Sequence, residues 1–286
     1  MLQDELSPVF VIGSYRSGTS VTTWCLGQHP NIWVLPETYW LAKFAEHVGE
    51  LYQMGTAQPA AHFARCGLTE GDFVAEARDF VNRVVRRGQE VRIRKLLTFL
   101  QSGGTVPPTV MLQRAPLEPK KRWVDGTPEN SHYVSHLLNL FPEAKFIHLV
   151  RSPHEVVRSL YKFDQAWEGA QPQEAVDGYA TWRRLAGAAF EAEQAFGSNV
   201  VRRFYHADLV RDPEGTLRSM LRWSGERFRP ECLTPLAERM NSSNVEGDEV
   251  FTADSVPASL KSTFADNEAF FVKLRDTKPV TPPDGT

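Results

Sequence analysis

The segment Gly13–Ser20, GSYRSGTS, combines glycines, hydroxyls and one arginine in a pattern suited to phosphate binding. Its G-x-x-x-x-G spacing is typical of loops whose backbone N–H groups turn toward one point. A helix starting near Gly18 would add partial positive charge there, and the hydroxyls of Thr19 and Ser20 could donate. Loops that bind ATP carry lysine after the second glycine, whereas here the cation is Arg16, inside the loop. The residues therefore favour a 5′-phosphate or a phosphosulfate over the γ-phosphate of ATP.

A second candidate site begins at Arg151, which directly follows the apolar run KFIHLV at 145–150. In parallel α/β sheets, ligands bind at the carboxyl ends of strands. Ser159 comes eight residues later, on the helix that Ser152 and Pro153 are expected to start. Arg151, Ser159 and the first loop could close around opposite ends of one nucleotide.

Short apolar runs alternate with helical patterns along the chain, which predicts an α/β fold with a central parallel sheet flanked by helices. Strands are expected at 9–12, 32–35, 122–124, 145–150 and 200–204. Helices are expected at about 18–28, 60–100, 130–140, 173–196 and 213–223, with another after Pro36. We interpret residues 60–105 as a helical insertion or lid on a single domain of 1–275, and 276–286 as a loose tail.

Composition limits the functional classes. The 286 residues are 42% hydrophobic, enough for one large domain with a sizeable core. A net charge of −3 argues against general electrostatic binding of nucleic acid, so any anion must be bound by a local cluster of cations. Cys25, Cys66 and Cys232 form no metal-binding pair, and no apolar run approaches the ~18 residues that span a bilayer. The N-terminus lacks the basic region of a secretory signal, and we expect a soluble, cytoplasmic protein.

Together these segments resemble the sulfotransferase family that uses 3′-phosphoadenosine 5′-phosphosulfate (PAPS). VFVIGSYRSGTS (9–20) resembles the 5′-phosphosulfate loop, PRSGT or PKSGT, with Tyr15 replacing the proline. KFIHLVRSPHEVVRSL (145–160) resembles the segment that binds the 3′-phosphate. The stretch 123–151 matches the layout of the bacterial branch, which is similar to protein-tyrosine sulfotransferases, and 205–223 looks like the family's YEDLV…P…TL…L element. The resemblance covers about 9–223 and implies a P-loop-like fold, PAPS as donor with product PAP, a hydroxyl-bearing acceptor and no metal.

The resemblance also implies roles for particular residues. The 5′-phosphosulfate would be bound by Arg16, Ser17, Gly18, Thr19 and Ser20, and the 3′-phosphate by Arg151 and Ser159. Arg16 is the candidate for neutralising charge on the leaving phosphate. Glu37, just past the second expected strand, is the candidate base, because a glutamate at this place is the proposed base in the related branch. A glutamate at a helix start is also favoured by the helix dipole alone.

The chain departs from the family at Gly126, where many relatives carry the lysine of a KTP sequence that helps the leaving group. Asp125, Glu129 and His132 stay open as alternatives for proton transfer. His132 and His136 lie four apart on one helix face, but no third ligand is evident and no metal site is predicted.

Other side chains near the motifs have two interpretations. His206 would either touch the nucleotide or pack in the core. Tyr39 and Trp40 would line an acceptor pocket or belong to the core with Trp24, Trp33 and Phe44. The arginines between 83 and 94 would form a solvated helix face or bind an anionic acceptor.

Two other functional classes stay open. One is a P-loop kinase or nucleotidase. The other is a non-catalytic protein that binds PAP or PAPS on a sulfotransferase fold, which Tyr15 and Gly126 would favour.

Overall fold

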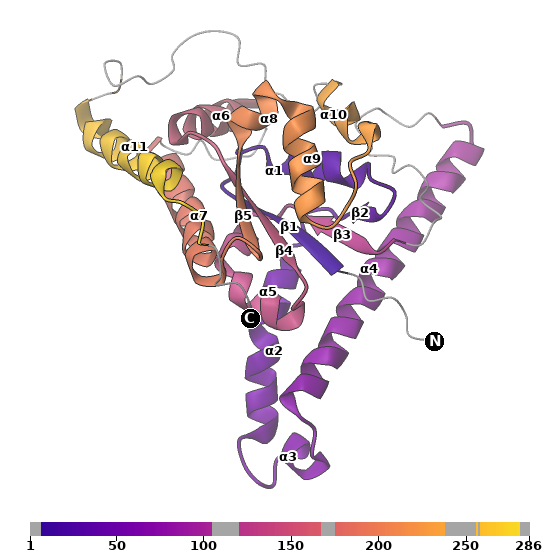
Figure 1. Ribbon diagram of the computed structural model, residues 1–286. Helices are drawn as coiled ribbons and strands as arrows, with labels where there is room; N and C mark the ends of the chain where they lie inside the picture. The colour runs from indigo at the N-terminus through magenta and orange to yellow at the C-terminus, as the bar shows by residue number, and fades with distance from the viewer. Residues whose placement is uncertain (1–6, 105–119, 167–174, 238–255, 257, 281–286) are drawn as a thin grey trace.

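The central sheet contains five parallel strands with helices on both faces (Figure 1). The computed structural model describes residues 7–104, 120–166, 175–237, 256 and 258–280. The strands are β1 (Ser7–Gly13), β2 (Ile32–Val34), β3 (Arg122–Asp125), β4 (Lys145–Val150) and β5 (Val201–Tyr205), in the order β2-β3-β1-β4-β5. All five expected strands are present, and the predicted α/β class is confirmed.

The α-helices among the described residues are α1 (Thr19–Gly27), α2 (Trp40–Thr56), α3 (His62–Cys66), α4 (Glu70–Gln101), α5 (Val134–Leu140), α6 (Pro153–Ala166), α7 (Ala175–Phe196), α8 (His206–Arg211), α9 (Pro213–Trp223), α10 (Thr234–Ala237) and α11 (Lys261–Asp276). Short 3₁₀ turns are η1 (Pro128–His132), η2 (Pro230–Leu233) and η3 (Ala258–Leu260). Within this part of the chain, no helix combines the length and apolar character needed to cross a bilayer.

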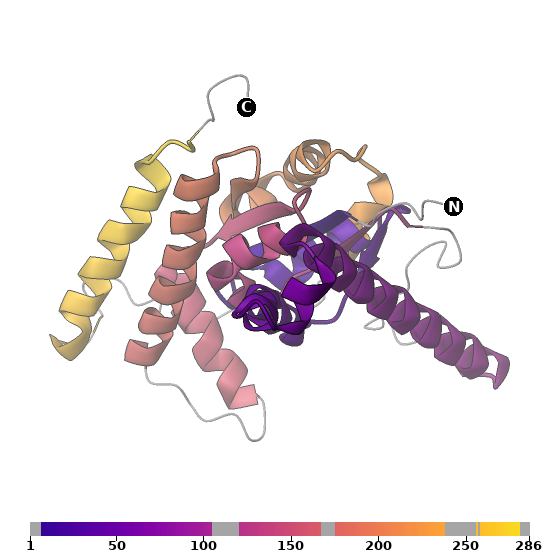
Figure 2. The same cartoon turned by 90° about the horizontal axis from the view of Figure 1, so that it is seen from below.

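The alternation of side chains along β1 builds a separate core on each face of the sheet. Val9 and Val11 pack toward α1 and α9, whereas Phe10 and Ile12 pack toward α2, α4, α5 and α7. A third cluster joins α6, α7 and α11 at one edge, and these three helices lie together in Figure 2. Because both faces are covered, β1 is buried from Pro8 to Gly13 and β4 from Phe146 to Val150.

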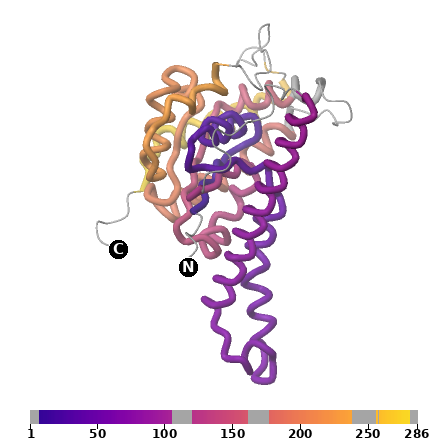
Figure 3. The backbone as a smooth tube through the Cα atoms, turned by 90° about the vertical axis from the view of Figure 1, so that its right-hand side faces the viewer, coloured from indigo at the N-terminus to yellow at the C-terminus, as the bar shows by residue number. Residues whose placement is uncertain are grey.

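The helical stretch expected at about 60–100 forms α3 and α4 rather than one continuous helix, and α2 joins them in a projection from the domain. α2 leads away from the sheet to α3, and α4 returns along the same projection (Figure 3). Gly67, with φ of 66°, ends α3, and Thr69 starts α4 with a capping box to Asp72. The first half of α4 packs on the core through Val74, Val81 and Val85. The tip at α3 lies far from α1, α6 and α8 (Figure 1).

Other elements also differ from the sequence-based expectation. The helix expected at 130–140 is divided into η1 and α5, because Tyr133 has a non-helical φ of −118°. Helices α8 and α11 were not predicted. The described start of the expected tail is tied to the domain: the carbonyl of Val280 accepts from the Ser198 N–H at 2.7 Å. Residues 281–286 lie outside the described part.

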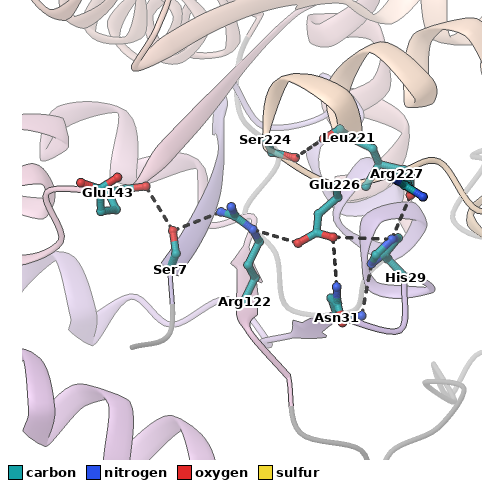
Figure 4. A network of polar contacts seen from close by, with 9 residues as sticks. All are labelled: Ser7, His29, Asn31, Arg122, Glu143, Leu221, Ser224, Glu226 and Arg227. Atoms are coloured by element: carbon teal, nitrogen blue, oxygen red, sulfur yellow. Dashed lines mark hydrogen bonds and ion pairs between the residues drawn. The ribbon is translucent and has the colours of Figure 1, made fainter. Parts of the chain in front are cut away.

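The amino ends of the strands are joined by a polar network (Figure 4). Arg122, at the start of β3, donates from Nε to Glu226 at 3.0 Å and from Nη1 to Ser7 at 3.1 Å. Asn31 Nδ2 donates to the second Glu226 oxygen at 3.1 Å. The ring of His29 accepts from the Asn31 N–H at Nδ1, so its Nε2 donates to a backbone carbonyl at 2.9 Å. These groups bond to one another, and they connect the segment that follows α9 to the starts of β1, β2 and β3.

Candidate functional site

The predicted phosphate loop connects β1 to α1 at the carboxyl edge of the sheet. β1 ends at Gly13, whose φ is 130°, and a Cβ there would lie 2.4 Å from the carbonyl oxygen of Leu149. Glycine is therefore required by both the backbone angle and the space. The Gly13 N–H donates to Ser131 Oγ at 3.0 Å, which fixes the start of the loop against η1. Sequence reasoning missed Ser131, because nothing in its own segment marks it as a partner of the loop.

Two buried hydroxyls in the loop have no partner among the described residues. Ser14 and Ser17 are each 1% exposed, and neither Oγ makes a hydrogen bond. Gly18, the N-cap of α1, has a φ of 93° and supplies no side-chain cap, and the first N–H groups of a helix have no intrahelical acceptor. Buried donors that the protein leaves unpaired at a helix N-terminus fit a phosphate or sulfate group.

Arg16 connects the loop to the second predicted site. Its Nε donates to Ser159 Oγ at 3.0 Å, although the two residues are 143 positions apart. Arg151 Nη1 donates to the carbonyl oxygen of Arg16 at 2.9 Å, and its Nε lies 3.2 Å from Glu155. Arg16 has a left-handed φ of 58°, which turns its carbonyl and side chain toward α6. The structure thus places all three residues side by side at one edge.

Residues of α7 and α11 contact the segment that begins at Arg151 and continues into α6. Trp182 Nε1 donates to the carbonyl oxygen of Arg151 at 3.1 Å. His154, in the first turn of α6, contacts Tyr179 Oη and Glu268 Oε2, each at 2.8 Å, and stacks on Phe264 at 3.8 Å between ring centroids. These contacts fix the start of the helix that carries Ser159.

His206 lies against the phosphate loop at the end of β5. A Cβ on Gly18 would lie 2.8 Å from His206 Cδ2, so the ring packs directly on this glycine. Burial and the nearby charge of Arg151 lower the pKa of His206 to about 4, so the ring is neutral at pH 7. Both sequence-based interpretations of His206 agree with this position, because it packs closely while lying beside the loop.

Glu37 is exposed at the carboxyl end of β2, where Tyr39 Oη donates to Glu37 Oε2. Tyr39 is 54% exposed and has a φ of 45°, a strained value for a residue with a Cβ. Burial of its hydroxyl and the adjacent Glu37 raise the pKa of Tyr39 to about 12. Trp40 is also exposed, whereas Trp24, Trp33 and Phe44 pack against the core. The Glu37 carboxylate and two exposed aromatic side chains therefore share one surface.

Asp125 holds the Glu37 segment in place. Its fully buried carboxylate accepts from Thr38 Oγ1 at 2.7 Å, from the N–H and hydroxyl of Thr127 at 2.9 and 2.6 Å, and from Asn130 Nδ2 at 3.0 Å. The Thr38 N–H donates to Thr127 Oγ1 at 2.8 Å. These four hydrogen bonds connect Asp125 to the chain on either side of the site, so its carboxylate positions Thr38, Thr127 and Asn130.

The other two alternatives for proton transfer lie on η1. Burial raises the pKa of Glu129, whose Oε2 has no partner among the described residues. His132 Nε2 lies 2.7 Å from Arg184 Nη1, and burial together with that cation lowers the pKa of His132. Within the described residues, no group of three potential metal ligands occurs.

At Gly126, where many relatives carry a lysine, the side chain of Thr23 occupies the space that a longer residue would need. A Cβ on Gly126 would lie 2.3 Å from Thr23 Oγ1 and 3.3 Å from Thr23 Cβ. Thr23 is buried and its hydroxyl donates to the carbonyl of Thr19 at 2.8 Å. The segment after β3 therefore lies directly on the first turns of α1, where a lysine would displace Thr23.

These features define an α/β protein with a loop rich in glycine and hydroxyl groups at the carboxyl edge of a parallel sheet. The sequence profile described as "Sulfotransferase family" matches residues 8–230. The chain therefore belongs to the sulfotransferase family. An uncharacterized protein from Aquifex aeolicus is 24% identical over 229 residues, which are 75% of this chain and 25% of that protein. The chain thus spans about a quarter of the length of this curated relative.

Solved sulfotransferases share the fold. The sulfotransferase domain of the Synechococcus PCC 7002 olefin synthase aligns with a TM-score of 0.52 and 19% identity, covering 95% of this chain and 97% of that domain. Sulfotransferase STF9 from Mycobacterium avium aligns with a TM-score of 0.51 and 16% identity, covering 98% of this chain and 79% of that protein. At these identities the similarity concerns the fold, and the site must be argued from this chain's own residues.

Proposed function

We propose that this protein transfers a sulfuryl group from PAPS to an acceptor hydroxyl. The observation that carries the proposal is the junction of the two nucleotide segments: Arg16 and Arg151 meet at the sheet edge beside the buried, unpaired hydroxyls of Ser14 and Ser17. A donor with phosphate groups at both ends needs two such anion sites on one surface. The family membership supports sulfuryl transfer in general.

The donor would lie across this edge. The loop from Arg16 to Ser20, with the N-terminus of α1, would bind the 5′-phosphosulfate, and Arg151 with Ser159 the 3′-phosphate. When PAPS binds, hydrogen bonds to PAPS would replace the hydrogen bond between Arg16 and Ser159. Arg16 Nε would then donate to a charged acceptor in place of the neutral hydroxyl oxygen of Ser159, which accepts in the present bond.

Transfer requires a base on the acceptor side and positive charge on the donor side. When bound, the donor supplies the sulfuryl group, which leaves its phosphate as the acceptor oxygen bonds to sulfur. Glu37 would take the hydroxyl proton, and the hydrogen bonds from Thr38 to Asp125 and Thr127 fix the chain beside it. Arg16 and the N–H groups of α1 would stabilise the charge left on the phosphate oxygen.

The acceptor would approach along the surface shared by Glu37, Tyr39 and Trp40. α4 runs past this surface, since Gln89 Nε2 donates to the carbonyl of Val34, at the end of β2, at 3.0 Å. Burial lowers the pKa of Arg92, one turn further along α4. Arg87 instead pairs with Glu90 on the solvent side. This placement supports the lid interpretation for the second half of α4 only, because the α3 tip lies far away.

A direct test measures PAP affinity by calorimetry and ³⁵S transfer from labelled PAPS to a panel of hydroxyl acceptors. We expect Arg16→Ala and Arg151→Ala each to weaken PAP binding by about 2–3 kcal/mol, or roughly 30–150-fold. Arg211→Ala is the matched control, because Arg211 is exposed on α8 and pairs only with Asp208. Equal PAP affinity in all four proteins would contradict the proposed site, and Mg²⁺-dependent transfer from ATP would favour a P-loop kinase.

A second candidate is a non-catalytic protein that binds PAP or PAPS. Its support is the packing of Gly126 on Thr23, which leaves no room for the lysine of many relatives. PAP binding that depends on Arg16 and Arg151, with no transfer to any acceptor, would select this candidate.

A further inference from the structure

A cleft of about 430 Å³ lies on the outer side of α7, between η1 and α11. The cleft is lined by His132 from η1, six residues of α7 and two residues of α11. The α7 and α11 members are Arg183, Arg184, Gly187, Ala188, Phe190, Glu191, Phe270 and Lys273. The volume is in the range of pockets that bind small molecules.

The cleft is separate from the nucleotide site. Leu185 and Ala189, on the opposite face of α7, are fully buried, and Ala189 belongs to the core beneath the sheet. The body of α7 therefore stands between the cleft and the strands. The floor is formed by small residues: a Cβ on Gly187 would meet no atom within 4 Å, so it would point into open space.

The residues that line the cleft carry a net positive charge, and Asp266, outside the lining, lies near Arg183. Arg183, Arg184 and Lys273 face Glu191, which leaves a net charge of +2 with His132 neutral. Among the described residues, none of the three cations forms a salt bridge. In contrast, Arg122, Arg203 and Arg218 each pair with a glutamate.

Two of the cations are held in fixed positions by neutral groups. Arg184 Nη1 donates to His132 Nε2 at 2.7 Å, and the positive charge of Arg184 contributes to the lowered pKa of His132. The guanidinium of Arg183 stacks on the Phe270 ring at 3.6 Å. Lys273 lies 5.8 Å from the Phe190 ring. The cations are thus oriented by contacts that leave their charge available to a ligand.

We propose that this cleft binds a dianion, namely a phosphate or sulfate group, either free or as the monoester of a small organic molecule. Two net positive charges match such a group, and the planar donors of Arg184 suit its oxygens. Phe190 and Phe270 offer apolar surface to the organic part of an ester.

The test blocks the cleft by filling its floor. Gly187→Leu places a side chain in the cleft and favours helix formation, so the fold is expected to persist. Gly88→Leu is the matched control: Gly88 also lies inside a helix, and a Cβ there also meets no atom within 4 Å. Lys273→Gln tests the charge, with Arg275→Gln, on the same helix but outside the cleft lining, as its control. Equilibrium dialysis with inorganic phosphate and with phenyl phosphate measures binding to the full chain.

We expect Gly187→Leu to lose one saturable binding site that wild type and Gly88→Leu share, and Lys273→Gln to weaken that site about tenfold relative to Arg275→Gln. Tighter binding of phenyl phosphate would identify an organic ester as the ligand, and equal affinities the free ion. Identical binding by wild type and Gly187→Leu, or no saturable binding up to about 10 mM, would overturn the proposal. The readout does not involve sulfuryl transfer, so it stands apart from the proposed enzymatic function.

Discussion

The two ends of the parallel sheet use their polar residues differently. At the amino ends, Arg122, Glu226, Asn31 and His29 bond to one another and to backbone groups. At the carboxyl ends, buried hydroxyls lack partners, and the two non-glycine residues with left-handed φ in the described chain, Arg16 and Tyr39, lie there. Unpaired buried groups and backbone strain both cost stability. We infer that the amino edge stabilises the fold, whereas the carboxyl edge keeps donors that would bind a ligand.

The largest expected effect is on catalysis at the carboxyl edge. Glu37→Gln should reduce the initial rate of ³⁵S transfer by ~10²–10⁴, because the amide cannot take the acceptor's proton. PAP affinity and the free energy of unfolding should change little, since Glu37 is exposed. Glu46→Gln, partly exposed on α2 and paired with Lys43, is the control and should keep full activity. A fully active Glu37→Gln protein would remove this residue from the mechanism.

The next effect is on stability at the amino edge. Glu226→Ala removes the acceptor of both Arg122 Nε and Asn31 Nδ2, and should lower the free energy of unfolding in urea by about 3 kcal/mol. PAP affinity of the folded protein should stay within about twofold of wild type. Glu214→Ala is the control. It breaks an exposed ion pair with Arg218, which also lies on α9, and should lower the free energy of unfolding by about 0.5 kcal/mol at most. Equal losses in the two variants would contradict the distinction between the two edges.

The third effect depends on pH. The pKa of His206 is lowered to about 4, whereas an unfolded chain titrates near its ordinary value of 6.5. The unfolded state therefore binds more protons between these values, and stability falls as the pH falls from about 6.5 to about 4. His206→Asn should reduce this loss by about 1–3 kcal/mol in urea titrations at pH 7 and about pH 4.5. His47→Asn, at an exposed position on α2, is the control. An unchanged pH dependence in His206→Asn would show that the ring is not held neutral by its position.

The smallest effect compares two buried serines, one at each edge. Ser17, 1% exposed, has no partner, whereas Ser224, 2% exposed, donates to the carbonyl of Leu221 at 3.0 Å. Ser224→Ala should destabilise the fold by about 1 kcal/mol, and Ser17→Ala should be neutral or slightly stabilising. Only Ser17→Ala should weaken PAP binding, by about 1 kcal/mol. Equal unfolding free energies for the two variants would show that the Ser17 hydroxyl has a partner in solution.

The sequence predicted the strands and the loop because these depend on local patterns. Apolar runs before Gly13 and Arg151 indicate buried strands, and parallel strands bring their carboxyl ends to one edge. The contact between Arg16 and Ser159 was not predictable as a hydrogen bond, since it joins residues 143 positions apart and depends on tertiary packing. The expectation that the two segments grip opposite ends of one nucleotide stays a prediction.

Several features carried no local signal. Asp125 was left open as a proton acceptor because the sequence does not show that four donors, from Thr38, Thr127 and Asn130, converge on its carboxylate. The break between η1 and α5 falls in a stretch without glycine, so composition gave no warning. Helix α11 is stabilised by contacts to α6 and α7, such as Glu268 on His154, rather than by a strong pattern of its own.

The packing of Gly126 on Thr23 has an evolutionary consequence. A lysine at position 126 would overlap Thr23, whose Oγ1 would lie 2.3 Å from the new Cβ, so position 126 cannot take a side chain while Thr23 stays in place. Restoring the lysine requires that residue 23 first become smaller, and an alanine there would open the path. The two positions should therefore change as a pair across descendants of this chain, with threonine accompanying glycine and a smaller side chain accompanying lysine.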